Sequence, residues 1–306
     1  KTAYEIRLSL VGSEMCIRDR TMSFKKIRFV ADSTCDIPPE LVQQHKIGIV
    51  PCYINYNNDS YADDGSVAFR EKFYADLPTM NPHPTTAAMP PAVAEKIIKE
   101  SLEDADHVVI MSVSSKLSGV YNALRLGASS LPADKYTLID SLSATMGLGF
   151  QVLIGIETAA ATNDIKQVVD TIERVRAVTH VYIAPATIEN MRRSGRVSWA
   201  QASIGALLQI KPLLDVHDGE VNSAGRVRTF KRAVEELVRF THEQAPLDRM
   251  AIVYTNAPEG AHELAATLRD VAPSGAVPII QVTPTLGTHV GPGGIGVVTI
   301  SQKWRT

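Results

Sequence analysis

The stretch IRFVADSTCDIPPE, residues 27–40, decides the fold class. Its apolar run, residues 27–31, has the length and composition of a buried strand. The polar letters DSTCD follow at once, and the pair Pro38 and Pro39 then suits the first turn of a helix. A buried strand that opens into a polar loop before a helix is typical of an α/β protein. We therefore expect a strand, a loop at its carboxyl end and a helix.

The same pattern recurs along the first half of the chain. The further strands predicted there are 47–54, 107–113 and 136–140, a proline-dense loop covers 77–91, and the predicted helices are 92–102, 143–161 and 164–177. Strands that alternate with helices indicate a parallel sheet with crossover helices. Ligands of such sheets bind outside the carboxyl ends of the strands. The polar loops at those ends are DSTCD, PTTAAMPP, SSKLSGVY and DSLSAT, so we expect a binding site there.

The second half also mixes strands and helices. Its predicted elements are a strand at 180–184, a helix at 197–208, a hairpin around 217–219, a helix at 231–243, a strand at 250–255, a helix at 260–271 and a strand at 297–301. The length of 306 residues is enough for two domains. We expect two α/β domains, residues 22–163 and 164–306, of which the first holds a parallel sheet with flanking helices.

Residues 1–21 are treated separately. The string YEIRLSLVGSEMCIRDR resembles the translation of a sequencing adapter, and Met22 followed by a basic pair and a strand is a normal start. The leader has neither the apolar core nor the cleavage site of a signal peptide. We expect residues 1–21 to be non-native and leave them out of the fold prediction.

Composition limits the classes of function. The net charge is −2 and the isoelectric point is near 6.5, which argues against a nucleic-acid binder. The three cysteines, Cys16, Cys35 and Cys52, have no CxxC spacing, so neither a disulfide framework nor a zinc site is expected. The histidines are scattered without metal-ligand spacing. No apolar run approaches the roughly 20 residues of a membrane span.

Motifs for catalysis are weak. The segment SSKLSGVY lacks the first glycine of a nucleophile elbow. The segment GPGGIG matches GxGxxG only loosely, and no acidic residue can follow at the usual spacing because the chain ends first. Its glycines either permit a tight turn or bring backbone N–H groups close to an anion. A stand-alone hydrolase or phosphotransferase remains the alternative from the enzyme class.

Two further features have open interpretations. The cluster Arg192, Arg193 and Arg196 is a solvated face, an anion site or a docking surface for an acidic partner. His289 is either a structural histidine or a donor to an anion beside the glycine turn. The sequence alone does not choose between these readings.

Four motifs, ADSTCDIP, SSKLSGVYNAL, MRRSGRVS with GALLQIKPLL, and GTHVGPGGIG, occur in one order and together resemble the DegV family. The resemblance implies the two-domain EDD fold, with a long-chain fatty acid held between the domains. It also implies a bacterial, cytoplasmic protein that is non-catalytic by itself and uses no cofactor or metal. Its implied partner is the catalytic subunit of a fatty acid kinase, to which it presents the lipid carboxylate, and transient contact with a membrane is expected. A lipid sensor with another protein partner is the further alternative.

The resemblance also implies which residues form the binding site. The family's carboxylate contacts correspond to Thr86 and Ser118, with Gly119 and His289 beside them, and the arginine cluster becomes the docking face. The family's TSQPS-like loop reads TAAMP here, so Ala87 and Ala88 depart from the pattern and Thr85 could substitute for Thr86. The remaining secondary candidates are Ser33, Ser115 and Thr288. The candidate tunnel lining, which could equally be ordinary core, is Ile204, Leu207, Leu208, Ile210, Leu213 and Leu214.

Overall fold

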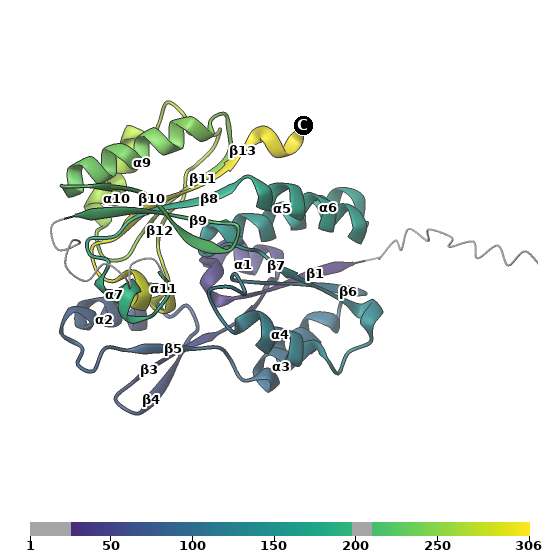
Figure 1. The fold of residues 1–306 in the computed structure, drawn as a ribbon. Helices are drawn as coiled ribbons and strands as arrows, with labels where there is room; N and C mark the ends of the chain where they lie inside the picture. The colour runs from purple at the N-terminus through teal and green to yellow at the C-terminus, as the bar shows by residue number, and fades with distance from the viewer. Residues whose placement is uncertain (1–25, 198–209) are drawn as a thin grey trace, which may run out of the picture.

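The computed structural model describes residues 26–197 and 210–306, and its first sheet is parallel (Figure 1). The strand order is β2-β1-β6-β7, and all three pairings are parallel. The predicted parallel sheet is therefore confirmed, and the carboxyl ends of its strands open at one edge. The strands are β1 (Ile27–Asp32), β2 (Gly48–Val50), β6 (His107–Ser112) and β7 (Tyr136–Asp140).

Helices cover both faces of this sheet because alternate strand residues point to opposite sides. Val30 and Ile110 face α3 (Pro91–Leu102) and α4 (Val120–Ala128). Phe29 and Met111 face the other way. The helices on that side are α1 (Pro39–His45), α5 (Met146–Thr162) and α6 (Ile165–Ala177).

The strand predicted at 47–54 is wrong as one continuous element. Pro51 has no N–H for a ladder hydrogen bond, and the chain changes sheet there. Residues before it form β2, and residues after it form β3 (Cys52–Tyr56), the centre of a small antiparallel sheet with order β4-β3-β5. The proline-dense loop also contains β5 (Thr85–Ala87), which pairs Thr86 with Ile54. The other elements of this part are β4 (Asp59–Asp63) and α2 (Val67–Asp76).

The second large sheet has six strands in the order β10-β9-β8-β13-β11-β12. Its pairings are antiparallel except that of β11 with β12. The predicted hairpin is β9 with β10. The strands are β8 (Thr179–Ala184), β9 (Lys211–His217), β10 (Glu220–Val227), β11 (Leu247–Tyr254), β12 (Ile279–Gln281) and β13 (Ile295–Ser301).

Helices pack on both faces of the six-stranded sheet as well. One face is covered by α9 (Phe230–Gln244) and α10 (Pro258–Thr267). The other face packs against α5, which turns Phe150 and Ile154 toward Val181 and Val298. Because α5 also packs on the first sheet through Leu148 and Val152, it is the layer between the two sheets.

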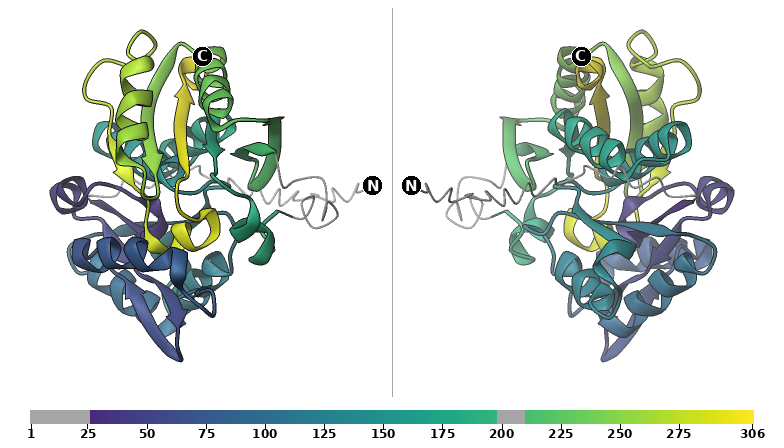
Figure 2. Two further views of the ribbon diagram at one scale, coloured as in Figure 1. Left: turned by 90° about the vertical axis from the view of Figure 1, so that its left-hand side faces the viewer. Right: turned by 90° about the vertical axis from the view of Figure 1, so that its right-hand side faces the viewer.

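Short elements fill the junction between the sheets. Figure 2 shows the two sheets one above the other, with α11 (Pro284–Val290, yellow) at the level where they meet. The remaining elements are α7 (Glu189–Arg193) and the 3-10 turns η1 (Ser33–Cys35), η2 (Leu77–Thr79), η3 (Ala133–Lys135) and η4 (Gln302–Arg305). The helix predicted at 197–208 lies, except for Val197, outside the described residues, as does the leader.

The two halves of the chain are interleaved. Val168 and Ile172 of α6, which falls in the predicted second domain, pack against Phe29 of the first sheet. The late helix α11 contacts β3 and β5 from the first half. The division of the chain between residues 163 and 164 stays a prediction.

Candidate functional site

A cavity of about 200 Å³ lies where the loops of the first sheet meet the second sheet. Most of its wall is aliphatic, with examples in Leu117 of the loop before α4, Val216 of β9 and Leu286 of α11. The lining residues with a hydroxyl, guanidinium or imidazole group are Thr34, Thr86, Ser118, Arg196, Thr285 and His289, and Gly119 lies beside Ser118. The sequence predicted a site at the carboxyl ends of the parallel strands, and part of this lining comes from there.

The cavity has a polar end and an apolar end. A smaller space of about 50 Å³ shares Ala144, Ile183, Val216, Leu286 and Val290 with it. None of Thr86, Ser118, Arg196 and His289 lines that smaller space. A ligand with one anionic head and a hydrocarbon tail matches this distribution of wall chemistry.

Thr86 and His289 form one polar pair in the wall. The Thr86 Oγ1 and His289 Nε2 atoms are 3.0 Å apart and hydrogen-bonded, which joins β5 to the end of α11. Burial lowers the pKa of His289 to about 3, and the charges of Arg196 and His83 act in the same direction. The imidazole is therefore neutral near pH 7. Its buried Nδ1 has no hydrogen-bond partner within the described part of the chain.

Ser118 and Gly119 form a second polar group at the start of α4. The Ser118 Oγ accepts a bond of 3.4 Å from the Val120 N–H, so its hydroxyl proton stays available to a ligand. Gly119 is the N-cap of α4 and provides no side-chain cap. Ser118 is half-buried and Gly119 is exposed, which places the mouth of the cavity here. A helix start of this kind favours an anion.

Arg196 supplies the positive charge of the cavity wall. Its Nη1 donates to the Ser194 carbonyl at 2.6 Å and its Nε to the Leu117 carbonyl at 3.4 Å. Across residues 26–197 and 210–306, no carboxylate forms a salt bridge with it. Burial lowers the pKa of Arg196, but a guanidinium remains charged at neutral pH. The wall therefore holds a half-buried cation without an acidic partner.

A family model for uncharacterised proteins of the DegV family matches residues 26–302 of this sequence. The chain belongs to the DegV family. The similarity that the four motifs indicated is thereby confirmed over nearly all of the described chain.

Relatives of known structure share this fold. A DegV-family protein of Thermus thermophilus, described by its fatty acid binding, is 31% identical, with a TM-score of 0.82 over 90% of this chain and 99% of its own. DegV of Bacillus subtilis, described as a fatty acid binding protein, is 25% identical, with a TM-score of 0.78 over 90% and 99%. A DegV domain-containing protein of Streptomyces coelicolor is 30% identical over 91% of this chain and 99% of its own.

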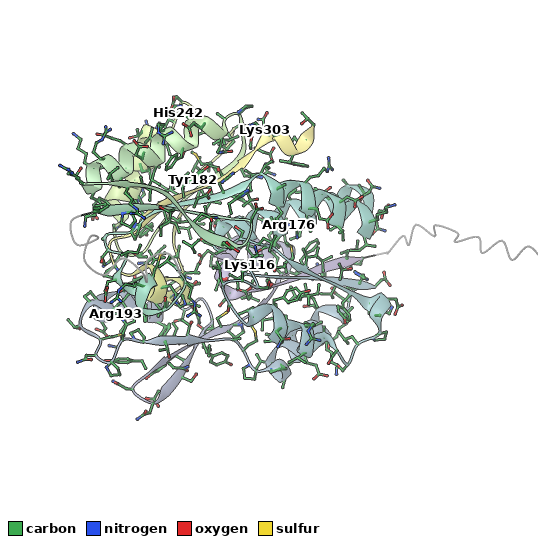
Figure 3. The ribbon with its side chains drawn as sticks, in the orientation of Figure 1. Lys116, Arg176, Tyr182, Arg193, His242 and Lys303 are labelled. Atoms are coloured by element: carbon green, nitrogen blue, oxygen red, sulfur yellow. The ribbon has the colours of Figure 1, made fainter. Side chains whose placement is uncertain are left out.

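The arginine cluster of this DegV-family chain is divided between two environments. Arg192 and Arg193 both pair with Glu189, at 2.9 Å and 2.7 Å, on the outside of α7. Figure 3 shows Arg193 at the margin of the molecule. The chain turns at Gly195, which has φ 74°, and Arg196 then lines the cavity. Arg196 therefore lies apart from Arg192 and Arg193, and a docking face formed by all three stays a prediction.

The secondary candidates lie outside the cavity lining. Thr85 is exposed next to Thr86, because neighbouring strand residues face opposite sides. Ser115 is exposed, and its N–H donates to Asp140 at 3.2 Å. The Ser33 Oγ accepts from the Cys52 N–H at 3.0 Å, and the Thr288 Oγ1 donates to the Pro284 carbonyl at 2.9 Å, so both serve the fold.

Thr34 and Thr285 line the cavity but were not predicted. Thr34 follows Ser33 in DSTCD, and only the direction of η1 decides which of the two faces the cavity. Thr285 lies in the first turn of α11, a helix that was not among the predicted elements. Neither residue carried a distinctive spacing that would have marked it.

The glycine loop does not offer its N–H groups to an anion. The N–H of Gly291 donates to the Gly287 carbonyl at 2.8 Å, that of Gly293 to Asn256 Oδ1 at 2.6 Å, and that of Gly294 to Thr255 Oγ1 at 2.9 Å. Gly291 and Gly293 have φ of 79° and 77°, so the tight-turn interpretation holds. The loop borders the apolar space through Gly294 instead.

Of the six residues predicted to line the tunnel, the three that the structure describes do not line the cavity. Ile204, Leu207 and Leu208 lie outside the described residues. Ile210, Leu213 and Leu214 are absent from the lining of both spaces, and Leu213 packs in the core under α9. From the same strand, Val216 lines the cavity.

Two classes of feature are absent from the part of the chain that the structure describes. No group of three or more His, Cys, Asp or Glu side chains there could hold a metal ion. None of the helices described within 26–197 and 210–306 combines the length and apolar character needed to cross a membrane.

Proposed function

We propose that this DegV-family protein binds a long-chain fatty acid, with the carboxylate at the polar end of the cavity and the tail along its aliphatic wall. The observation that carries this proposal is that Arg196, which forms no salt bridge within residues 26–197 and 210–306, lines a mostly aliphatic cavity together with Thr86, Ser118 and His289. The relatives described as fatty acid binding proteins support it.

The polar groups suit a carboxylate. An ionised carboxylate only accepts hydrogen bonds, and it needs donors or a positive charge. Ser118 and Thr86 provide hydroxyl donors, and Arg196 provides the charge. The neutral His289 has a single N–H, and when its Nε2 donates to Thr86 the Thr86 hydroxyl is free to donate to the carboxylate, while His289 adds no second charge. One cation and one anion therefore balance within the wall.

The hydrocarbon tail and the carboxylate of a fatty acid contribute differently to the free energy of binding. Each buried CH₂ contributes about 0.8 kcal/mol, so roughly 14 methylenes contribute on the order of 11 kcal/mol before the costs of ordering. A hydrogen bond to a charged head adds about 1.5–3 kcal/mol. The tail should dominate the affinity, and the head groups should fix the direction in which the lipid lies.

The first experiment is denaturing extraction and mass spectrometry of the protein purified from a bacterial host. We expect a stoichiometric fatty acid in the wild type and less in Arg196→Gln and Ser118→Ala. Arg232→Gln is the control, because Arg232 is an exposed residue of α9 that pairs with Glu235. If the wild type neither retains a host lipid nor binds added palmitate, the proposal is wrong.

We further propose that the protein presents the carboxylate to a separate fatty acid kinase, which forms the acyl phosphate. The family resemblance supports this step, and so does the position of Ser118 and Gly119 at the mouth, where a second protein can reach the head group. Arg192 and Arg193 on the outside of α7 are the candidate docking residues. Arg193→Glu should reduce phosphate transfer and leave the lipid content intact, whereas Arg239→Glu on α9 should change neither.

A further inference from the structure

Two buried carboxylates from the first part of the chain hold the start of α11. The Asp36 Oδ1 accepts the Thr283 N–H at 2.8 Å, across 247 residues of sequence. The Asp63 Oδ2 accepts both the N–H and the Oγ1 hydroxyl of Thr285, at 2.9 Å and 2.6 Å. Asp36 is 6% exposed and Asp63 is 1% exposed. Buried carboxylates satisfied in this way fix the groups that donate to them.

Tyr74 forms a third contact with the start of α11. The Tyr74 hydroxyl donates to the carbonyls of Val282 and Thr283, at 3.0 Å and 3.3 Å. Its ring packs on Gly287, where an added Cβ would clash with the Tyr74 ring and hydroxyl. Arg70 Nη1 also donates to the Gln281 carbonyl at 2.6 Å, just before α11 begins.

The same short helix carries part of the cavity wall. Leu286, His289 and Val290 all line the cavity. His289 follows Thr285 by four residues, which is about one helical turn, so the two share a face of α11. The bond between His289 and Thr86 spans only 3.0 Å, and a small shift of the helix would break it.

We propose that Asp36 and Asp63 are positioning residues of the fatty-acid site, which hold the first turn of α11 so that His289 keeps its bond to Thr86. The inference rests on the proposed function for its ligand. Neither carboxylate lines the cavity, so each acts through α11 and has no contact with the lipid.

The test compares Asp63→Ala with Asp63→Asn. The amide oxygen of asparagine can still accept both bonds from Thr285, and alanine can accept neither. The first readout is the ¹⁵N resonances of the His289 ring in the lipid-free protein, which report its hydrogen bond and tautomer. The second readout is the affinity for palmitate. We expect Asp63→Ala to change the His289 resonances and weaken palmitate binding about tenfold, and Asp63→Asn to restore both.

Asp164→Ala is the matched control. Asp164 also accepts N–H bonds at a helix start, from Lys166 at 2.9 Å, but it caps α6 and lies outside the cavity lining. This variant should lose stability without changing the His289 resonances. If Asp63→Ala does not fold, Thr285→Val removes only the hydroxyl bond and should still change those resonances.

The two proposals fail in different ways. Unchanged His289 resonances in folded Asp63→Ala or Thr285→Val would overturn the positioning role. If the wild type binds no palmitate but the His289 resonances still change in Asp63→Ala, the proposed fatty-acid ligand is wrong. The positioning role of Asp63 is then still supported.

Discussion

At the scale of single residues, Arg196 and His289 show how one wall can hold a positive charge and a neutral donor side by side. Burial and the charge of Arg196 keep His289 neutral, since a second cation there would be desolvated and repelled. The charge for a carboxylate therefore comes from Arg196. Between pH 5 and 8, His289 should not titrate, and its contribution to the site should stay constant.

Asp36 gives a prediction for stability against pH. Burial raises the pKa of Asp36 to about 7, although Arg70, Thr145 and the Thr283 N–H oppose the shift. Between about pH 4 and pH 7 the folded protein holds a proton that the unfolded chain has lost, so the free energy of unfolding should fall as the pH rises through this window. The limiting slope for one group is about 1.4 kcal/mol per pH unit.

Asp36→Asn should reduce this slope, because an amide mimics the protonated acid and asparagine tolerates the φ of 51° at this position. Urea unfolding of both proteins at several values of pH between 4 and 8 measures it. Equal slopes in the wild type and the variant would show that Asp36 ionises normally.

Some residues of the site could be predicted from the sequence and others could not. The motifs located Thr86, Ser118 and His289, and the structure brings all three into one wall. They did not separate Arg196 from Arg192, because the turn at Gly195 that points them in different directions has no strong local signature. Thr34 was not predicted, because a 3-10 turn has no apolar period that would show which of its residues faces inward.

At the scale of elements, long periodic segments were predictable and short ones were not. The strands of the parallel sheet follow from short apolar runs, α5 from a long run of small and apolar residues, and α6 and α9 from apolar periodicity. The three-stranded sheet and α11 do not, since β5 has only three residues and α11 only seven. Thr86 lies in β5 and His289 lies in α11. The motifs therefore predicted these two residues, but apolar periodicity did not predict the strand and the helix that hold them.

Gly219, at the tip of the β9–β10 hairpin, connects the second sheet to loops of the first. Gly219 has φ 83°, its N–H donates to the Leu142 carbonyl, and its carbonyl accepts from the Ser114 hydroxyl at 2.7 Å. Figure 3 shows Lys116 beside this hairpin, and its Nζ donates to the Asp218 carbonyl at 2.9 Å. The hairpin tip thus supports the loop that leads to Ser118.

Gly219→Ala should destabilise the protein by about 1–3 kcal/mol more than Gly65→Ala. Both glycines have positive φ, but a Cβ at Gly219 would lie 2.8 Å from Ser114 Oγ and 3.0 Å from Leu142 Cδ2, while a Cβ at Gly65 meets nothing within 4 Å. The pair separates backbone strain from steric contact. If the two variants shift the midpoint of chemical unfolding equally, the hairpin tip accommodates the added methyl group without loss of stability.

At the scale of the whole molecule, the helix α5 links the two large sheets. Its Leu148 packs with Phe29 of the first sheet, and its Phe150 packs with Val181 and Val298 of the second. Because one helix packs on both sheets, the loss of α5 from either sheet also exposes apolar surface of the other.

Phe150→Ala should therefore destabilise both sheets together, by about 3–5 kcal/mol. Circular dichroism and the fluorescence of Trp304, in a Trp199→Phe background, should report one coincident transition. Leu126→Ala is the control, because Leu126 is 43% exposed and should change stability little. Two separate transitions would show that the sheets unfold independently.

The central place of β13 has a consequence for synthesis. Its residues, Ile295–Ser301, lie between β8 and β11 in the sheet, although more than a hundred residues separate β8 from β13 in sequence. Until they leave the ribosome, β8 and β11 have no common neighbour in the nascent chain, and α11 has only just emerged. The parallel sheet can form early, whereas the second sheet and the His289 side of the cavity must wait, with strand edges exposed to chaperones in the interval.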